Sequence, residues 1–137
     1  MITEEIFVEP VTENMICFLV FVIKKDSLSN HTDISMIQKT MTKGHLKSSG
    51  SELIAARHQL KFDIIGDKDI LSSYFIEHPL YKRVEHADAG NVLTSQLVKL
   101  HKQEFFVRLS LNPESKFISI SEITPEIKQK EIARLKI

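Results

Sequence analysis

Histidine, tyrosine and basic side chains gather near the middle of the chain, in a combination suited to acid–base work on RNA. His78 and His86 flank a short segment that contains Tyr81, Lys82 and Arg83. Imidazole groups transfer protons near neutral pH, and Lys and Arg bind phosphate. The same side chains are also ordinary members of a solvated surface. A small ribonuclease or toxin is therefore one alternative function, and its RNA-contacting residues would come from Arg57, His58, Tyr81, Lys82, Arg83, His86 and Arg108.

The other residue types that carry chemistry form no recognisable site. None of the six histidines stands four residues from another, and the four glycines are too far apart for a phosphate-binding loop. No serine lies in a nucleophile-elbow pattern, and Cys17 lies in an apolar run where a thiol is expected to be buried and reduced. We predict no catalytic residues, no metal site and no cofactor. The sequence favours a protein that is not an enzyme, without deciding the question.

Size and charge narrow the class of protein further. The chain has 137 residues, and its 18 Lys and Arg are balanced by 18 Asp and Glu. This length suits a single domain, 1–137, and the neutral balance provides no overall attraction to nucleic acid or to an anionic membrane. The longest apolar run, Met15–Ile23, falls well short of the roughly 20 residues that a membrane-spanning helix needs. We predict a cytoplasmic protein without a membrane partner, and nucleic acid is disfavoured.

The first half of the chain combines two expected strands with three expected helices. Ile6–Val11 contains a proline and is predicted to be an edge strand, while Met15–Ile23 is predicted to be a central strand covered on both faces. Apolar spacing and capping residues predict the helices. The first helix is capped by Thr32 or Asp33 and carries Ile34, Ile37 and Met41. The second helix starts at Ser51 and carries Leu53, Ala56 and Leu60. The third helix starts at Gly66, carries Ile70, Leu71, Tyr74 and Phe75, and ends at His78 and Pro79.

The second half is expected to end in a hairpin and a helix. From Leu80 to His101 the pattern is ambiguous, and residues 92–101 fit either a helix or a strand. Alternating apolar residues predict strands at Phe105–Leu111 and Phe117–Ile123, paired antiparallel through a turn at 112–115. Thr124, Pro125 and Glu126 then predict a capped helix from residue 125 to 137. The predicted fold class is α+β, with an antiparallel sheet packed against several short helices and a C-terminal helix.

The last third of the chain resembles the end of a PAS sensory domain. The similarity lies in Phe105–Pro113 and Phe117–Leu135, where the strand leads through Glu122-Ile-Thr-Pro125 into a charged segment. Ile64–Ile70 also resembles the entry to a central PAS helix. The resemblance implies a small apolar ligand in a pocket between sheet and helices, and a homodimer in which helix 125–137 passes on the signal. The residues that would line this pocket are Tyr74, Phe75, Phe105, Val107 and Leu109.

The resemblance favours a non-catalytic sensory or interaction module that binds a small ligand or a protein partner. Two alternatives remain beside it. One is the small ribonuclease or toxin described above, and the other is a partner-binding inhibitor or immunity protein without a pocket. Because unrelated functions share the same folds, fold class alone does not choose among these three.

Overall fold

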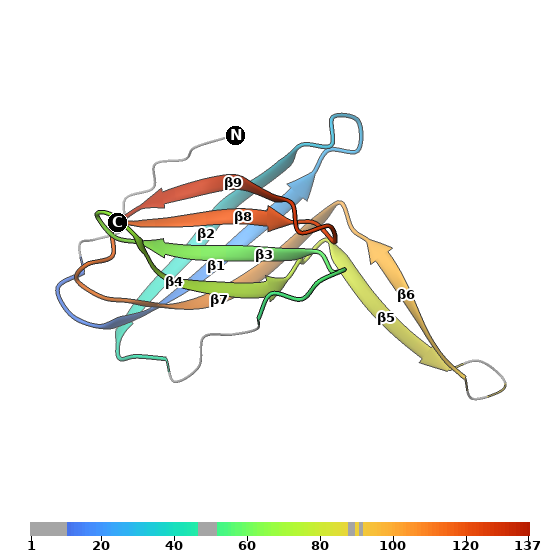
Figure 1. Cartoon of the computed structure of the whole chain (residues 1–137), viewed down its shortest axis with the longest axis horizontal. Coiled ribbons are helices and arrows are strands. Elements are labelled where there is room, and N and C mark those ends of the chain that lie inside the picture. The colour runs from blue at the N-terminus through green and yellow to red at the C-terminus, as the bar shows by residue number, and fades with distance from the viewer. Residues whose placement is uncertain (1–10, 47–51, 88–89, 91) are drawn as a thin grey trace.

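All regular secondary structure in the described part of the chain is β-strand (Figure 1). The computed structural model describes residues 11–46, 52–87, 90 and 92–137. The α+β prediction is therefore wrong, because every predicted helix that falls within these residues is replaced by strand or turn. The strands are β1 Met15–Lys25, β2 Thr32–Lys43, β3 Gln59–Ile65, β4 Ile70–Glu77, β5 Tyr81–Ala87, β6 Leu93–Lys99, β7 Lys102–Leu111, β8 Phe117–Ile123 and β9 Gln129–Lys136.

Two antiparallel sheets and a projecting hairpin make up the described fold. One sheet has the strand order β2-β1-β7, and the other has the order β4-β3-β8-β9. The two sheets lie face to face, and the β5–β6 hairpin extends away from them at one end (Figure 1). Strands β7 and β4 are edge strands of different sheets. Because β4 leads into β5 and β6 leads into β7, the hairpin is a continuation of these two edges.

The core lies between the two sheets. Phe21 of β1 and Phe62 of β3 meet across it, with ring centroids 6.1 Å apart. In β1 the odd-numbered residues from Cys17 to Ile23 are buried, whereas the even-numbered residues between them are part-exposed. The prediction of a central strand is confirmed, since β1 pairs with both β2 and β7. Its predicted burial on both faces is wrong, because only one face meets the second sheet.

β-Bulges explain three of the helix-like patterns. A bulge inserts one extra residue into a strand, so the apolar alternation changes phase and can imitate a helical spacing. In β2 the partners of Val20 and Phe21 are Gln38 and Met36, which leaves Ile37 as the extra residue. In β4 the extra residue is Leu71, and in β9 it is Ile132. The sets Ile34/Ile37, Ile70/Leu71/Tyr74 and Ile132/Leu135 therefore come from bulged strands.

The remaining local predictions divide into turns and pairing. The predicted turn at 112–115 is confirmed by the Ser115 N–H, which donates to the carbonyl of Asn112. The predicted hairpin is wrong, however, because β7 pairs with β1 while β8 pairs with β3 and β9. The turn after 111 therefore carries the chain from one sheet to the other. The two strand spans themselves are confirmed, and 92–101 includes strand β6 rather than a helix.

The predicted C-terminal helix is replaced by the β8–β9 hairpin. The Thr124 hydroxyl accepts a hydrogen bond from the Lys128 N–H (3.1 Å), so the capping residue closes a turn instead of starting a helix. Ile127 has φ of 60°, a left-handed value that a continuing right-handed helix excludes. Strand β9 then pairs with β8 along its length. The signalling role given to helix 125–137 has no helix to carry it.

Two N-terminal predictions fall largely outside the described residues. The edge strand Ile6–Val11 lies outside them except for Val11, which packs against the core. Ser51, the predicted start of a second helix, also lies outside them. The residues that follow form a turn with Ala56 at φ of 64°, and β3 begins at Gln59. Leu60, which was predicted to lie on the second helix, is instead the second residue of strand β3.

No helix in the described ranges is both long and apolar enough to cross a membrane.

We expect the thiol of Cys17 to be inert in the folded protein. Cys17 is fully buried, and burial raises its pKa to about 11, with a small opposing effect of Lys39. The nucleophile in thiol chemistry is the thiolate, which is therefore scarce and inaccessible. A disulfide reagent at mildly alkaline pH should react with Cys17 only as fast as the protein unfolds. An Ile37→Cys variant, whose new thiol is exposed, should react at once through that thiol; equally fast reaction of the parent protein would contradict the assignment.

Candidate functional site at the base of the hairpin

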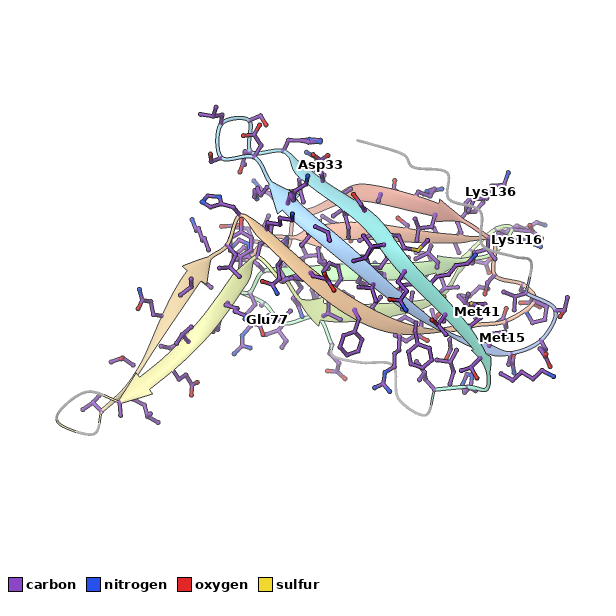
Figure 2. The ribbon with its side chains drawn as sticks, turned by 180° about the vertical axis from the view of Figure 1, so that it is seen from behind. Met15, Asp33, Met41, Glu77, Lys116 and Lys136 are labelled. Carbon is purple, nitrogen blue, oxygen red and sulfur yellow. The ribbon has the colours of Figure 1, made fainter. Side chains whose placement is uncertain are left out.

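A polar cluster lies where the β5–β6 hairpin leaves the two sheets. His78 and Pro79 connect β4 to β5, and Glu77, labelled in Figure 2, marks the end of β4 at this junction. The proline interrupts strand pairing, because it has no backbone N–H to donate. Strand β8 supplies Glu122, and the start of β2 supplies Thr32. Both sheets therefore contribute to the base of the hairpin.

His78 is held by hydrogen bonds at both ring nitrogens. Its ring is 2% exposed, and the Leu80 N–H donates to Nδ1 at 3.2 Å. Because Nδ1 accepts a hydrogen bond, Nε2 carries the proton and donates to Oε1 of Glu122 at 2.9 Å. The Thr32 hydroxyl donates to the same carboxylate oxygen at 2.8 Å. Every polar atom of the imidazole is therefore satisfied within the protein.

Glu122 carries the negative charge of this cluster. Its burial alone would raise its pKa, but the hydrogen bonds from His78 and Thr32, together with the charge of Lys25, lower the pKa below its ordinary value of 4.5. The carboxylate is thus stabilised by donors from β2 and from the segment after β4. A carboxylate that links three separate elements fixes the direction in which the hairpin leaves the sheets.

Tyr81, the first residue of β5, packs against two histidines and a lysine. Its ring stacks on His58, with centroids 3.7 Å apart and planes 4° from parallel, and meets the edge of His78 at 4.9 Å. Lys25 Nζ, at the end of β1, donates to the Tyr81 hydroxyl at 3.0 Å. The cluster surrounds the first residue of the hairpin on several sides. It anchors the hairpin base by stacking, hydrogen bonding and charge.

The arrangement suits positioning better than proton transfer. A general base needs a free nitrogen lone pair directed at a substrate, and both nitrogens of His78 are already used. Burial, followed by the nearby charges of Lys25 and Lys99, lowers the pKa of His58, while Glu126 acts in the opposite direction. His58 is consequently neutral near pH 7, with its ring covered on one side by Tyr81. Among the described residues no group of three His, Cys, Asp or Glu side chains could hold a metal ion.

An open groove starts beside this cluster and follows the two edge strands β4 and β7. Its first part has a volume of about 290 Å³ and includes Pro79, Tyr81 and Phe106 in its lining. A second part of about 230 Å³ shares Ile76 and Phe106 with the first, and a third part of about 300 Å³ shares Tyr74 with the second. The groove therefore runs along the side of the molecule where the edges of the two sheets face each other.

The five residues predicted to line a ligand pocket are divided between core and groove. Tyr74, Val107 and Leu109 are buried in the core, whereas Phe75 and Phe105 are part-exposed. Tyr74, Phe75 and Val107 also line the second part of the groove, and Phe105 lines the first. Leu109 lines none of the three parts. Four of the five predicted residues thus line the groove, and within the described ranges no helix covers it.

The structure brings together only part of the basic and histidine set predicted for RNA. His58 and Tyr81 stack, and Lys82 follows Tyr81 on β5. Arg83 lies further along the hairpin, and the side chain of His86 lies outside the described residues. The other two members are also exposed: Arg57 lies in the turn before β3, and Arg108 lies on β7.

Sequence reasoning missed three members of the polar cluster: Lys25, Thr32 and Glu122. Glu122 lies 90 residues after Thr32 in the chain, and the three residues meet because β1 and β8 end, and β2 begins, at the same place. One signal was available, since Glu122 is the only charged residue in a strand that otherwise contains Phe, Ile and Ser. A carboxylate inside a strand expected to be buried requires partners.

Comparison of the chain with family models, with curated proteins and with solved structures finds no match. The function has to be argued from the geometry of the chain itself.

We expect the folded state to lose stability as the pH falls below neutral, in two steps. His58 has a folded-state pKa below 6.5, so the unfolded chain binds the proton more readily and stability begins to fall below that pH. Glu122 has a folded-state pKa below 4.5, so its contribution is present above that pH and is lost as the pH falls further. Urea unfolding at a series of pH values measures both steps. His58→Gln should remove the first step, and an unchanged profile would contradict this assignment.

Proposed function

We propose that this protein is a non-catalytic interaction module whose β5–β6 hairpin docks on a partner protein. The observation that carries the proposal is the exposure of apolar side chains on a hairpin without a supporting sheet. Leu93 is 73% exposed, and Val84 and Leu97 are 44% and 42% exposed. Strands β5 and β6 hydrogen-bond to each other and to no further strand of the described chain. An isolated two-stranded hairpin is marginally stable in water, so a partner surface would supply the burial that it lacks.

The polar cluster supports the same proposal. Tyr81 and His78 anchor the hairpin base through contacts to His58, Lys25 and Glu122. A preorganised binding element loses less conformational freedom when it docks than a mobile one. The cluster thus accounts for a hairpin that extends into solvent in a defined direction without its own core.

Photo-crosslinking in the cells that naturally produce the protein tests the proposal. A photoreactive amino acid at Leu93 places the probe on the hairpin, and the same amino acid at Ile37 places it on the exposed part of β2. We expect a discrete crosslinked adduct from the Leu93 probe and none from the Ile37 probe. The adduct should also weaken when Leu97→Ser removes a second apolar side chain from the hairpin. Absence of any adduct from Leu93 would overturn the proposed function.

Binding of a small apolar ligand is the second candidate, favoured by the aromatic lining of the groove. Phe105, Phe106 and Tyr81 all line its first part. Native mass spectrometry of gently purified protein would reveal a retained molecule as a discrete extra mass. A ligand that leaves when Phe106→Ser is introduced would support this candidate, and bare protein at every stage of purification would count against it.

A further inference from the structure

We propose that the partner is a second copy of this chain, and that the two copies exchange hairpins so that each β5–β6 hairpin lies in the β4/β7 groove of the other. This inference rests on the proposed function, because it identifies the partner of the same hairpin. It follows from the chain connectivity, because each strand of the hairpin is continuous along the chain with a strand that lines the groove. Strands β4 and β7 line the groove, and their continuations β5 and β6 form the hairpin.

A two-fold axis at the hairpin base makes this exchange geometrically consistent. The hairpin extends from its base away from the two sheets (Figure 1). The residues that line the groove follow β4 and β7 from the same base in the other direction. Rotation by half a turn about that base places the groove of the second copy along the hairpin of the first. Cyclic two-fold dimers of this self-complementary kind are the commonest oligomers.

Strand direction agrees with the exchange. Strand β4 runs toward the base and β5 runs away from it, so after a half-turn β5 of one copy is antiparallel to β4 of the other. The same holds for β6 and β7. Every strand pair within the described chain is antiparallel, and the exchanged hairpin would extend both sheets in that manner. Addition of a strand to an open sheet edge is a common mode of recognition.

The lengths match. Strands β5 and β6 each have seven residues, which corresponds to about 23 Å of extended chain. Strand β7 has ten residues, or about 33 Å, and lines the groove along most of its length. Strands β5 and β6 are therefore short enough to lie along the groove of the second copy without passing its far end.

The composition of strand β4 distinguishes it from the other edge strands, since the edge strand β7 also carries charged residues, among them Lys102 and Arg108. Natural proteins protect open sheet edges with charged side chains, especially lysine. The edge strand β2 carries Lys39 and Lys43, and the edge strand β9 carries Lys130 and Lys136. By contrast, β4 has no charged residue from Ile70 to Ile76. An edge without such protection is suited to pairing with another strand.

Charges and apolar residues fall opposite each other in the exchanged arrangement. Lys82 and Lys99 lie at the base of the hairpin. Glu77, the last residue of β4, and Glu104 of β7 both line the first part of the groove. None of these four residues forms an ion pair within the described part of the chain. Further along, the half-turn brings Leu97 of one copy close to Phe106 of the other. Phe106 is 69% exposed, so this contact would cover apolar surface that is otherwise wet.

Sedimentation equilibrium of the full chain tests the exchange. We expect a dimer whose dissociation constant rises roughly tenfold or more in Leu97→Ser on the hairpin and in Phe106→Ser on the groove. Both side chains are exposed, so each variant should remain folded, and Ile37→Ser on β2 serves as the matched control with unchanged association. An equal mixture of the two variants restores one intact hairpin–groove contact and should associate more tightly than either variant alone.

The outcomes separate this inference from the proposed function. Weaker association of both variants, with recovery in the mixture, supports the exchanged dimer. A parent protein that remains monomeric, or a dimer that neither variant weakens, overturns it. If the chain is monomeric and the Leu93 probe crosslinks a protein of different mass, the interaction function stands and the exchanged dimer falls. If the chain is monomeric and the Leu93 probe gives no adduct, both fall.

Discussion

Leu60→Ala is expected to lower the free energy of unfolding by about 2–5 kcal/mol. Leu60 lies in β3 and is fully buried in the core, with strand neighbours Ile76 in β4 and Glu122 in β8. Removal of its side chain loses apolar burial and leaves a cavity between the two sheets, because β3 is held on both sides and cannot move inward. Chemical denaturation monitored by circular dichroism measures the loss.

Leu28→Ala is the matched control for this change. Leu28 has the same side chain but is 96% exposed in the turn between β1 and β2. Surface substitutions of this kind usually change stability by no more than about 0.5 kcal/mol. If Leu60→Ala cost as little as Leu28→Ala, β3 would not be a central strand of the second sheet.

Glu122→Ala is expected to destabilise the protein by about 2–4 kcal/mol, although the side chain is not part of the apolar core. The change leaves the Nε2–H of His78 and the hydroxyl of Thr32 without their acceptor. The imidazole is almost fully buried, so the loss of this acceptor leaves its desolvation uncompensated. Denaturation at neutral pH measures the effect.

Two further variants show whether the hydrogen bonds are responsible. Glu122→Gln keeps an acceptor oxygen at the same position and should cost clearly less than Glu122→Ala. Glu126→Ala removes a carboxylate from the exposed β8–β9 turn and should be nearly neutral. Equal losses for the alanine and glutamine variants of Glu122 would show that packing or charge, rather than hydrogen bonding, holds the cluster together.

Apolar alternation predicted several of the strands, but it did not predict that strands would replace the expected helices. Met15–Ile23, Phe105–Leu111 and Phe117–Ile123 alternate or run apolar without interruption, and all three are strands. The segments around Ile37 and Leu71 contain a bulge, and the phase change produced spacings that a helix would also give. A bulge depends on the partner strand, which a local pattern does not contain.

Strand pairing was the second property beyond the reach of local patterns. The short turn after Leu111 predicted a hairpin, yet β7 and β8 belong to different sheets. The first strand, β1, takes both β2 and β7 as partners, while β8 pairs with β3 and β9. These choices depend on contacts between residues far apart in the chain, which is also why Thr32 and Glu122 were not foreseen as partners.

The most direct test of the interaction account is amide hydrogen exchange of the full chain at low and high protein concentration. We predict that exchange in β5 and β6 slows as concentration rises, together with exchange in the outer edges of β4 and β7, while the outer edge of β2 does not change. In dilute solution the hairpin should exchange fast, because two strands without a supporting sheet open readily. Slow exchange of β5 and β6 that does not depend on concentration would show that the hairpin needs no partner and would contradict the account.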